Sequence, residues 1–319
     1  MYYLQKNYIE TKDNDGLLYP RIIFNNCLSS ISLTKKNPFL LGQQSIKTGD
    51  IFRRLLLHLR QFDHSEITRA SFLKNEVEKI IEDLRSLRRH VPNQLYDVTY
   101  ESRDLADTKL DIVESTVAQA IHTAYHYLGS ARRDAIHLGL RCNSCSTHRN
   151  KLLSLVALSP LDIPHLINAL PSNVNRNEVL VLSRLFAFNN VPSNTISFTL
   201  GRVFKWLRNE LPNIKMLISY LDPNIGFSGS VYRATNWKIF AREKKTRYLY
   251  IDSKYVTDRY VIETYGSTNL STLQKILGSR IKRSKMPVQP LDIYYYLLDP
   301  KLKNDDSSSK MLELIPYSK

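Results

Sequence analysis

The chain has 319 residues, of which 43% are hydrophobic and only 10 are glycine, so it is long enough for one large globular domain or two small ones. Its 45 basic and 30 acidic residues give a net charge of +15, which favours a polyanionic partner, most often nucleic acid. No apolar run approaches the roughly 18 residues of a membrane span, and the first residues lack a secretory pattern. We therefore expect a cytoplasmic protein without a membrane partner.

With three cysteines, at least one stays unpaired in any disulfide pattern, and such an odd number fits a reducing compartment. Cys142 and Cys145 are separated by two residues, and His148 follows them. These three side chains are a candidate zinc site, with His137 or Cys27 as a fourth ligand. The alternative is a polar hairpin turn between two apolar runs. The sequence leaves both open, and it identifies no metal ion.

The first 105 residues are predicted to form a mainly helical N-terminal extension, although residues 1–48 show no sustained period. Apolar residues recur with helical spacing from Asp50 and again from Leu73. Acidic residues open the second helix and arginines close it, which complements the helix dipole. Contact of these arginines with DNA phosphate is the alternative. Pro92 ends this helix, and residues 93–108 are expected to be a charged linker. The apolar stripes are Ile51, Leu55, Leu59 and Phe62, then Leu73, Val77, Ile80, Leu84 and Leu87, and the arginines are Arg85, Arg88 and Arg89.

An α/β pattern begins near Leu110, and a helix that ends at Gly129 is predicted from the apolar stripe Val113, Val117, Ile121, Ala124 and Leu128. Residues 135–142 and 152–158 are predicted strands joined by the cysteine-bearing turn, and residues 159–177 a loop with at most one helical turn. A third predicted strand, residues 179–188, contains Arg184. A charge inside a strand is unfavourable unless it is paired or exposed at a cleft. Arg184 is therefore either a strand-end ligand or a paired structural ion.

The segment after this strand leads into an amphipathic helix. Its apolar stripe is Ile196, Leu200, Val203, Leu207 and Leu211. Ser193 or Asn194 is the predicted N-cap, because short polar side chains accept hydrogen bonds from the first backbone N–H groups.

The stretch MLISYLDPNIGFSGSVYRATNW, residues 216–237, combines an apolar run, a turn-rich loop and an aromatic segment. Residues 216–221 are a predicted buried strand, which Pro223 ends because proline donates no ladder hydrogen bond. Gly226 and Gly229 permit turns, and Ser228 is the predicted cap of a short helical segment.

Polar side chains gather after this strand, where ligands of open α/β sheets bind. We expect Asp222, Tyr232 and Asn236 to converge there. The alternative is that Asp222 and Asn236 only cap turns, and that Tyr232 and Trp237 only pack.

This stretch resembles the signature of the Mom-type phage DNA-modification proteins, which belong to the GNAT acyltransferase superfamily and alter adenine in DNA. The pattern is S-Y-x-D-P followed by G-x-x-G-x-x-Y-x-A-x-N-W, and Leu221, Phe227 and Thr235 stand where alanine, histidine and alanine are expected. Its residues here are Ser219, Tyr220, Asp222, Pro223, Gly226, Gly229, Tyr232, Ala234, Asn236 and Trp237.

Two further segments resemble the same family. One is L-S-R-L at residues 182–185 with P-x-N-x-x-S at residues 192–197, and the other is TDRYVIETYG at residues 257–266. GNAT enzymes bind the pyrophosphate of coenzyme A at such a strand–turn–helix, through backbone amides at the helix N-terminus. The resemblance thus implies acyl-CoA or a related acyl donor, held by Arg184, Ser193 and Asn194. The usual glycine-rich loop is absent, which leaves the donor open.

The resemblance implies an α+β fold with a GNAT-like mixed sheet flanked by helices over residues 106–303. It also implies a transferase that adds a carbamoylmethyl or acyl-type group to the exocyclic amine of adenine, protecting DNA from restriction in a bacterial or phage-infected host cell. The base would be flipped or unpaired. Asp222 would orient or deprotonate the amine, Tyr232 would donate a proton, and Ser197 would complete the catalytic set. The substrate-binding residues would be Tyr220 and Trp237, which stack on the base, Asn236, and the basic Arg280, Lys282 and Arg283, which contact phosphate.

Residues 238–242 and 247–253 are predicted to form a hairpin, residues 293–298 a strand, and residues 304–319 a disordered tail. Residues 1–105 are expected to be a DNA-binding arm, a homodimer-forming arm or a lid on the core. Two other functions stay open: N-acyltransfer to a protein or small molecule, and non-catalytic nucleic-acid binding by a GNAT core.

Overall fold

The structure is a computed structural model, and it describes most of the chain beyond residue 47. The described residues are 40–41, 44–45, 48–67, 69–88, 105–130, 132, 134–143, 151–188, 191–243, 247–286, 288–299 and 302. Several predictions concern residues outside this part: the linker up to residue 104, the ligands Cys27, Cys145 and His148, the tail at 304–319, and Arg89 with the side chains of Arg85 and Arg88.

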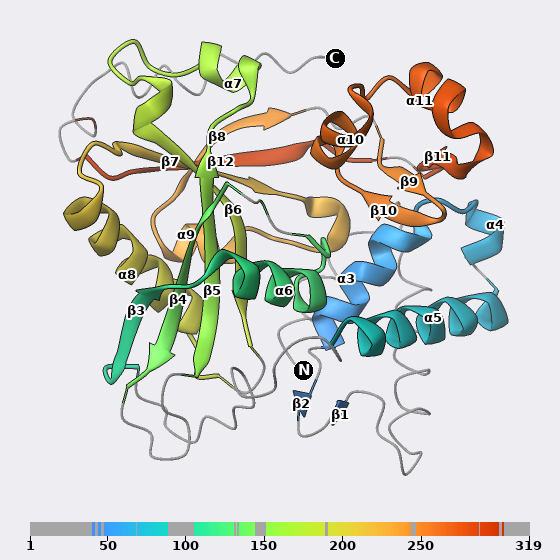
Figure 1. Cartoon of the computed structure of the whole chain (residues 1–319), viewed down its shortest axis with the longest axis horizontal. Coiled ribbons are helices and arrows are strands. Elements are labelled where there is room, and N and C mark those ends of the chain that lie inside the picture. Colours follow the sequence, from blue (N-terminus) through green and yellow to red (C-terminus); the bar gives the residue numbers. More distant parts are fainter. Residues whose placement is uncertain are drawn as a thin grey trace.

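A seven-stranded sheet forms the centre of the described chain, in the order β3-β4-β5-β6-β7-β12-β8 (Figure 1). Neighbouring strands are antiparallel except for β6 and β7, which are parallel. The predicted mixed sheet of an α+β fold is confirmed. The strands are β3 Thr108–Ile112, β4 Ile136–Cys142, β5 Leu152–Pro160, β6 Val179–Ala187, β7 Met216–Leu221, β8 Lys238–Glu243 and β12 Leu291–Leu297.

Helices cover both faces of this sheet, because side chains along each strand alternate between the faces. On β7, Leu217 and Leu221 pack in a cluster with α8 (Thr195–Glu210) and α9 (Ser230–Ala234). Met216 and Ile218 pack in another cluster with α7 (Pro164–Asn168). The helix α6 (Ser115–Tyr125) packs with β5 and β6 in a cluster of its own. Short 3-10 turns lie at η2 Arg176–Glu178 and η3 Pro223–Ile225.

Two local predictions in this region are wrong. The predicted helix forms as α6, but it ends at Tyr125, four residues before the predicted end at Gly129. It begins at Ser115, and Leu110 before it lies in β3, which pairs with β4. The predicted hairpin of residues 238–253 does not form, because β8 pairs with β12 and the next strand belongs to another sheet. Pairing between strands distant in sequence, which local patterns do not encode, decides the second case.

A smaller unit follows β8. Its three-stranded sheet has the order β10-β9-β11, from Lys254–Val256, Leu249–Ile251 and Ile281–Arg283. Two helices, α10 (Asp258–Tyr265) and α11 (Leu270–Leu277), pack on one face of this sheet, and η4 (Gly278–Arg280) leads into β11.

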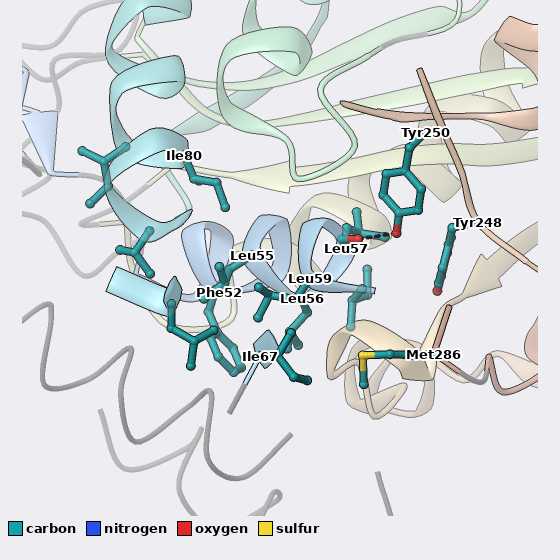
Figure 2. Packing of buried hydrophobic residues seen from close by; sticks show 14 of the residues in the cluster. Phe52, Leu55, Leu56, Leu57, Leu59, Ile67, Ile80, Tyr248, Tyr250 and Met286 are labelled. Atoms are coloured by element: carbon teal, nitrogen blue, oxygen red, sulfur yellow. Dashed lines mark hydrogen bonds between the residues drawn. The ribbon is translucent and has the colours of Figure 1, made fainter. Parts of the chain in front are cut away.

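The N-terminal helices pack beside this smaller unit (Figure 1). They are α3 Thr48–Leu59, α4 His64–Ile67 and α5 Ala70–Arg88, and short strands β1 Leu40–Leu41 and β2 Gln44–Ser45 precede them. Figure 2 shows their apolar side chains against Tyr248, Tyr250 and Met286, and Ile225 joins the same cluster. The Tyr250 hydroxyl donates a hydrogen bond of 2.5 Å to the Leu57 carbonyl oxygen. The division of the chain at residue 105 stays a prediction, but helices on its N-terminal side share a core with residues beyond it.

No helix in the described part of the chain has the length and apolar character needed to cross a membrane.

Removing residues 1–105 should leave Tyr248, Tyr250 and Ile225 without the helices that now cover them, and each exposed large side chain costs about 1.5–3 kcal/mol. We expect the shortened chain to aggregate or to lose cooperative thermal unfolding. Removal of residues 1–39 alone is the control and should keep both properties. A shortened chain that stays monomeric and unfolds cooperatively would support the separable arm predicted from the sequence.

Candidate functional site

The parallel strands β6 and β7 diverge part of the way along their length. Their pairing runs from Val179↔Met216 to Leu182↔Ser219 and ends there. Beyond this point β6 stays paired with β5 as far as Ala187, and β7 stays paired with β12 as far as Leu221. Both strands therefore turn an unpaired backbone edge toward the same opening, which we call the strand split. Parallel strands end at the same side of a sheet, so the segments after β6 and β7 lie at this side too.

A chain of side-chain hydrogen bonds lies at the start of the strand split. Ser219 Oγ donates to the Leu182 carbonyl oxygen at 2.9 Å and lies 2.7 Å from the Tyr232 hydroxyl. A serine hydroxyl has one proton, so Tyr232 is the donor to Ser219. Burial raises the pKa of Tyr232 to about 12. The phenol is therefore neutral at physiological pH and holds a proton at the strand split.

Tyr232 lies on α9, and the start of this helix approaches β12 closely. Gly229 is the N-cap at a φ of 73°, whereas Ser228 was the predicted cap. A Cβ atom at Gly229 would lie 2.5 Å from the Tyr294 hydroxyl, so only glycine lets α9 approach β12 this closely. The rings of Tyr232 and Tyr294 are then stacked, with centroids 4.7 Å apart.

Asp222 follows β7 and is held by three hydrogen bonds. Its Oδ1 accepts from the Asn224 backbone N–H at 3.0 Å and from Asn224 Nδ2 at 2.8 Å, and its Oδ2 accepts from the Tyr248 hydroxyl at 2.6 Å. A carboxylate has about four acceptor positions, so one is left for a ligand. The turn-capping role and a ligand-binding role are thus compatible. Sequence reasoning missed Tyr248, because nothing in its local pattern indicates contact with a residue 26 positions earlier.

A bulge in β6 decides where Arg184 points. Leu182 pairs with Leu158 and Arg184 pairs with Ala157, which leaves Ser183 as an extra residue. The bulge turns Arg184 to the sheet face that carries α6 rather than α8. Its Nε and Nη2 donate to the carbonyl oxygen and hydroxyl of Ser130, at 2.7 and 3.1 Å, and Nη1 donates to the Ser183 carbonyl oxygen at 2.6 Å.

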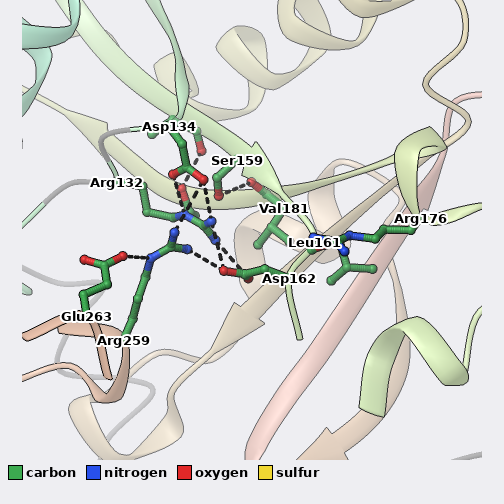
Figure 3. Close-up of polar contacts among 11 residues, drawn as sticks. Arg132, Asp134, Ser159, Leu161, Asp162, Arg176, Val181, Arg259 and Glu263 are labelled. Atoms are coloured by element: carbon green, nitrogen blue, oxygen red, sulfur yellow. Dashed lines mark hydrogen bonds and ion pairs between the residues drawn. The ribbon is translucent and has the colours of Figure 1, made fainter. Parts of the chain in front are cut away.

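Arg184 takes part in no ion pair among the described residues. Within them, the predicted alternative of a paired structural ion is therefore not found. Burial lowers the pKa of Arg184, and the nearby positive charges of Arg132 and Arg259 act in the same direction. Figure 3 shows that these two arginines instead bind Asp134 and Asp162, and that Arg259 also binds Glu263. The half-buried guanidinium of Arg184 is therefore suited to an anionic ligand.

The segment after β6 leads to the N-terminus of α8, on the side of the sheet where the strand split opens. Asn194 is the N-cap with a φ of 68° but makes no side-chain cap hydrogen bond, and Ser193 is exposed. Ser197 Oγ donates to the Asn194 carbonyl oxygen at 3.0 Å. The first backbone N–H groups of a helix have no partner within it and attract anions.

The three predicted base-binding residues do not form one binding surface. Trp237 is only 4% exposed and packs against Phe204 and Tyr296, so stacking on a base would require it to leave the core. Tyr220 lies on the α7 face of β7, opposite the face that carries Tyr232. Asn236 follows α9 instead of lying on it, is exposed and has a φ of 61°.

Of the four basic residues between positions 280 and 285, two form ion pairs with carboxylates and two form none within the described residues. Arg280 binds Asp252 at 2.6 and 2.9 Å, and Lys285 binds Asp63. Lys282 and Arg283 are exposed on β11 and form no ion pair within the described residues. Only the latter two are therefore free to contact phosphate without first breaking an ion pair.

Tyr127 lies within electrostatic range of Arg184, Asp222 and Tyr232, and sequence reasoning missed it. Burial raises its pKa, and the charges of Arg184 and Asp222 and the phenol of Tyr232 all act on it. It follows α6, and its ring lies 5.3 Å from that of Phe227. The sequence contains 19 tyrosines, and no local signal distinguishes Tyr127 from the others.

No group of three histidine, cysteine or carboxylate side chains among the described residues has the geometry of a metal site. Cys142 is buried in β4, but the proposed ligands Cys145 and His148 lie outside the described residues, so the zinc prediction stays a prediction. His122, His126 and His137 are buried together, and His122 lies with its ring 5.9 Å from each of the other two.

A mixed sheet whose parallel pair diverges beside a phenol, a carboxylate and a half-buried cation defines an α+β protein with a candidate ligand site at the strand split. The chain belongs to the Mom protein family, which it matches over residues 107–319. This confirms the resemblance seen in the sequence. No curated protein matches the chain significantly.

Several solved acetyltransferases are similar to the chain in structure. The spermidine/spermine N-acetyltransferase SpeG from Vibrio cholerae has a TM-score of 0.35 at 8% identity, over 63% of this chain and 98% of that one. The ribosomal-protein-S5-alanine acetyltransferase from Vibrio fischeri has a TM-score of 0.35 at 10% identity, over 62% and 96%. The putative acetyltransferase YncA from Salmonella typhimurium, solved with acetyl-CoA, has a TM-score of 0.35 at 7% identity, over 61% and 95%.

The buried histidines predict a loss of stability in mild acid. Burial lowers the pKa of His122, His126 and His137, and the charge of Arg184 lowers that of the first two further. Below a pH of about 6.5, the ordinary histidine pKa, these histidines take up protons in the unfolded chain but stay neutral in the folded chain. The free energy of unfolding should therefore fall by up to about 1.4 kcal/mol for each histidine per unit decrease in pH. Above about pH 6.5 these residues should have no effect.

Urea unfolding between about pH 7.5 and 5 measures this slope. The matched variant is His122→Leu, because both ring nitrogens of His122 are buried without a hydrogen-bond partner. The variant should have a flatter slope in this pH range. An unchanged slope would mean that His122 takes up its proton in the folded state.

Proposed function

We propose that the chain is a transferase that adds a small carbamoylmethyl or acyl-type group to the exocyclic amine of adenine in DNA. Its membership of the Mom family supports this proposal, and its net charge of +15 favours a nucleic-acid substrate. The observation that carries it is the geometry of the strand split, where the Tyr232 phenol is hydrogen-bonded to Ser219, the Asp222 carboxylate follows β7 and the Arg184 guanidinium is held by Ser130. Such a set suits transfer between an anionic donor and an amine.

The donor would bind across the strand split, between Arg184 on the face that carries α6 and the N-terminus of α8 on the other face. Arg184 is a half-buried cation whose hydrogen bonds go to Ser130 and Ser183, so an anionic group can approach it without displacing a carboxylate. Ser193, Asn194 and Ser197 would contribute the polar rim of the helix N-terminus. Acyl-CoA or a related acyl donor fits this set of groups, and when bound it supplies the group that is transferred.

Asp222 and Tyr232 would act on the acceptor amine and the leaving group. The open acceptor position of Asp222 can receive one N–H of the adenine amine and so orient its lone pair. Three hydrogen bonds already restrict the carboxylate, which makes orientation its better-supported role. Burial raises the pKa of Tyr232 to about 12, so Tyr232 is protonated at physiological pH and can give its proton to the leaving group as the bond between that group and the transferred group breaks. The amine proton that is released as the new bond forms would pass to the Asp222 carboxylate.

Adenine in a duplex is stacked, so the enzyme must flip the base or act on unpaired DNA, which costs a few kcal/mol. Lys282 and Arg283 on β11 are candidates for holding the DNA backbone, because their charges are not used in ion pairs within the described residues. Tyr220, Asn236 and Arg280 stay candidates for substrate contact, and Trp237 stays one only if it leaves its buried position.

Mass analysis of nucleosides from DNA co-expressed with the protein tests the proposal. We expect a new adenine adduct. An acylated protein or small molecule in place of an adduct would indicate N-acyltransfer to another substrate, and the absence of any product would indicate a binding protein without catalysis.

Tyr232→Phe should lower the adduct yield about 100-fold or more, because it removes the proton donor. It should destabilise the fold by only about 0.5–1.5 kcal/mol, since one hydrogen bond to Ser219 is lost. Asp222→Asn should lower the yield similarly. Ser219→Ala is the matched control, because it breaks the same hydrogen-bond chain but leaves the Tyr232 hydroxyl in place. Equal losses in Ser219→Ala and Tyr232→Phe would assign Tyr232 to scaffolding.

DNA binding should weaken by at least about tenfold between about 50 and about 200 mM salt, because neutralised phosphates release counterions. Replacing Lys282 and Arg283 together by glutamine should reduce the slope of log affinity against log salt by about two. Lys205→Gln, an exposed lysine on α8, is the control. Affinity that does not depend on salt would contradict a role of the positive charge in binding DNA.

A further inference from the structure

The helix α3 lies outside the family-matched residues 107–319, yet it contacts both segments that border the strand split. One segment, residues 126–130, follows α6 and contains Tyr127 and the Ser130 that binds Arg184. The other, residues 222–229, follows β7 and contains Asp222. We call them the α6 segment and the β7 segment.

Arg54 holds the α6 segment. Its Nη2 donates to the carbonyl oxygens of Thr123 and His126, at 3.0 and 2.7 Å. The last carbonyl groups of a helix have no partner within it and carry partial negative charge, so a guanidinium is well suited to this position. The contact fixes the point at which the chain leaves α6 and turns toward Tyr127 and Ser130.

Arg53 and Arg60 hold the β7 segment. The Arg53 guanidinium lies 4.3 Å from the centre of the Phe227 ring, and Phe227 in turn packs against Tyr127 at 5.3 Å. Arg60 is buried, and its Nη2 donates to the Asn224 carbonyl oxygen at 3.0 Å. The Asn224 side chain then binds Asp222 and the Gln289 backbone. Together α3 and Arg60, which directly follows it, thus restrain the carboxylate, the aromatic pair and the segment that anchors the cation.

We propose that α3 is part of the active site and that Arg53 and Arg54 are positioning residues for the transfer reaction. This inference rests on the proposed function, because it assigns the groups that set the distance between Asp222, Tyr127 and Arg184. Small displacements of reacting groups lower rates strongly, about 100-fold for an error of about 1 Å. Arg53 and Arg54 are only partly buried, so replacing either one leaves the hydrophobic cluster of α3 intact.

The test uses the full-length protein with Arg53→Gln and Arg54→Gln. Arg69→Gln is the matched control, because Arg69 is also an N-terminal arginine over an aromatic ring, 5.9 Å from the centre of Phe72, but touches neither segment. Three quantities are measured for each variant: adenine adduct per folded protein, thermal unfolding, and amide hydrogen exchange along the chain.

We expect Arg53→Gln to speed exchange in residues 222–229 and Arg54→Gln to speed it in residues 123–130, each by about tenfold or more, with melting temperatures within about 3 °C of wild type. Adduct formation should fall about 10- to 100-fold in both. The conservative Arg53→Lys and Arg54→Lys should recover part of the loss, because a lysine can still approach the ring or the carbonyl groups. Arg69→Gln should change none of these quantities.

Wild-type adduct formation in either glutamine variant would overturn the proposal, and so would faster exchange spread over the whole chain with a lower melting temperature. If the wild-type protein forms no adduct, the proposed function fails, but hydrogen exchange still decides the inference. Faster exchange confined to the two segments then supports the holding role of α3, and unchanged exchange overturns it.

Discussion

The candidate site depends on the point at which β6 and β7 stop pairing. Backbone N–H and C=O groups need hydrogen-bond partners, so a sheet that opens must satisfy them by other means. Ser219 does this for the Leu182 carbonyl group and, in doing so, becomes the acceptor for Tyr232. The phenol that we propose for catalysis is therefore held by the same serine hydroxyl that satisfies the carbonyl group at the end of the paired part of the two strands.

Electrostatics divides the arginines of the site into two groups. Arg132 and Arg259 are neutralised by Asp134 and Asp162, and this network links the segment before β4, the segment after β5 and α10 (Figure 3). Arg184 is close enough to both arginines for their charges to act on it, but its hydrogen-bond partners within the described residues are uncharged. The network therefore supplies structure, whereas the charge of Arg184 is not neutralised by the described residues and suits the anionic ligand that we propose.

The N-terminal helices contact the candidate site from outside the family-matched region. Their apolar faces share a cluster with Tyr248, whose hydroxyl binds Asp222, so hydrophobic packing and the geometry of the carboxylate are linked through one side chain (Figure 2). Arg53 and Arg54 of α3, and Arg60 directly after it, add polar contacts to the segments that border the strand split. Residues that precede the family-matched region are thus physically continuous with the residues proposed to carry the chemistry.

The sequence by itself determined the elements with strong local periodicity, such as β5, β7 and α8, and its motif indicated Asp222 and Tyr232 together. Only the tertiary structure decided which face each side chain occupies and which distant residue it meets. One extra residue in β6 turned Arg184 toward α6, and burial placed Trp237 in the core. The physical reason is that periodicity reflects contacts within an element, whereas bulges, strand neighbours and contacts between segments depend on the whole chain being packed at once.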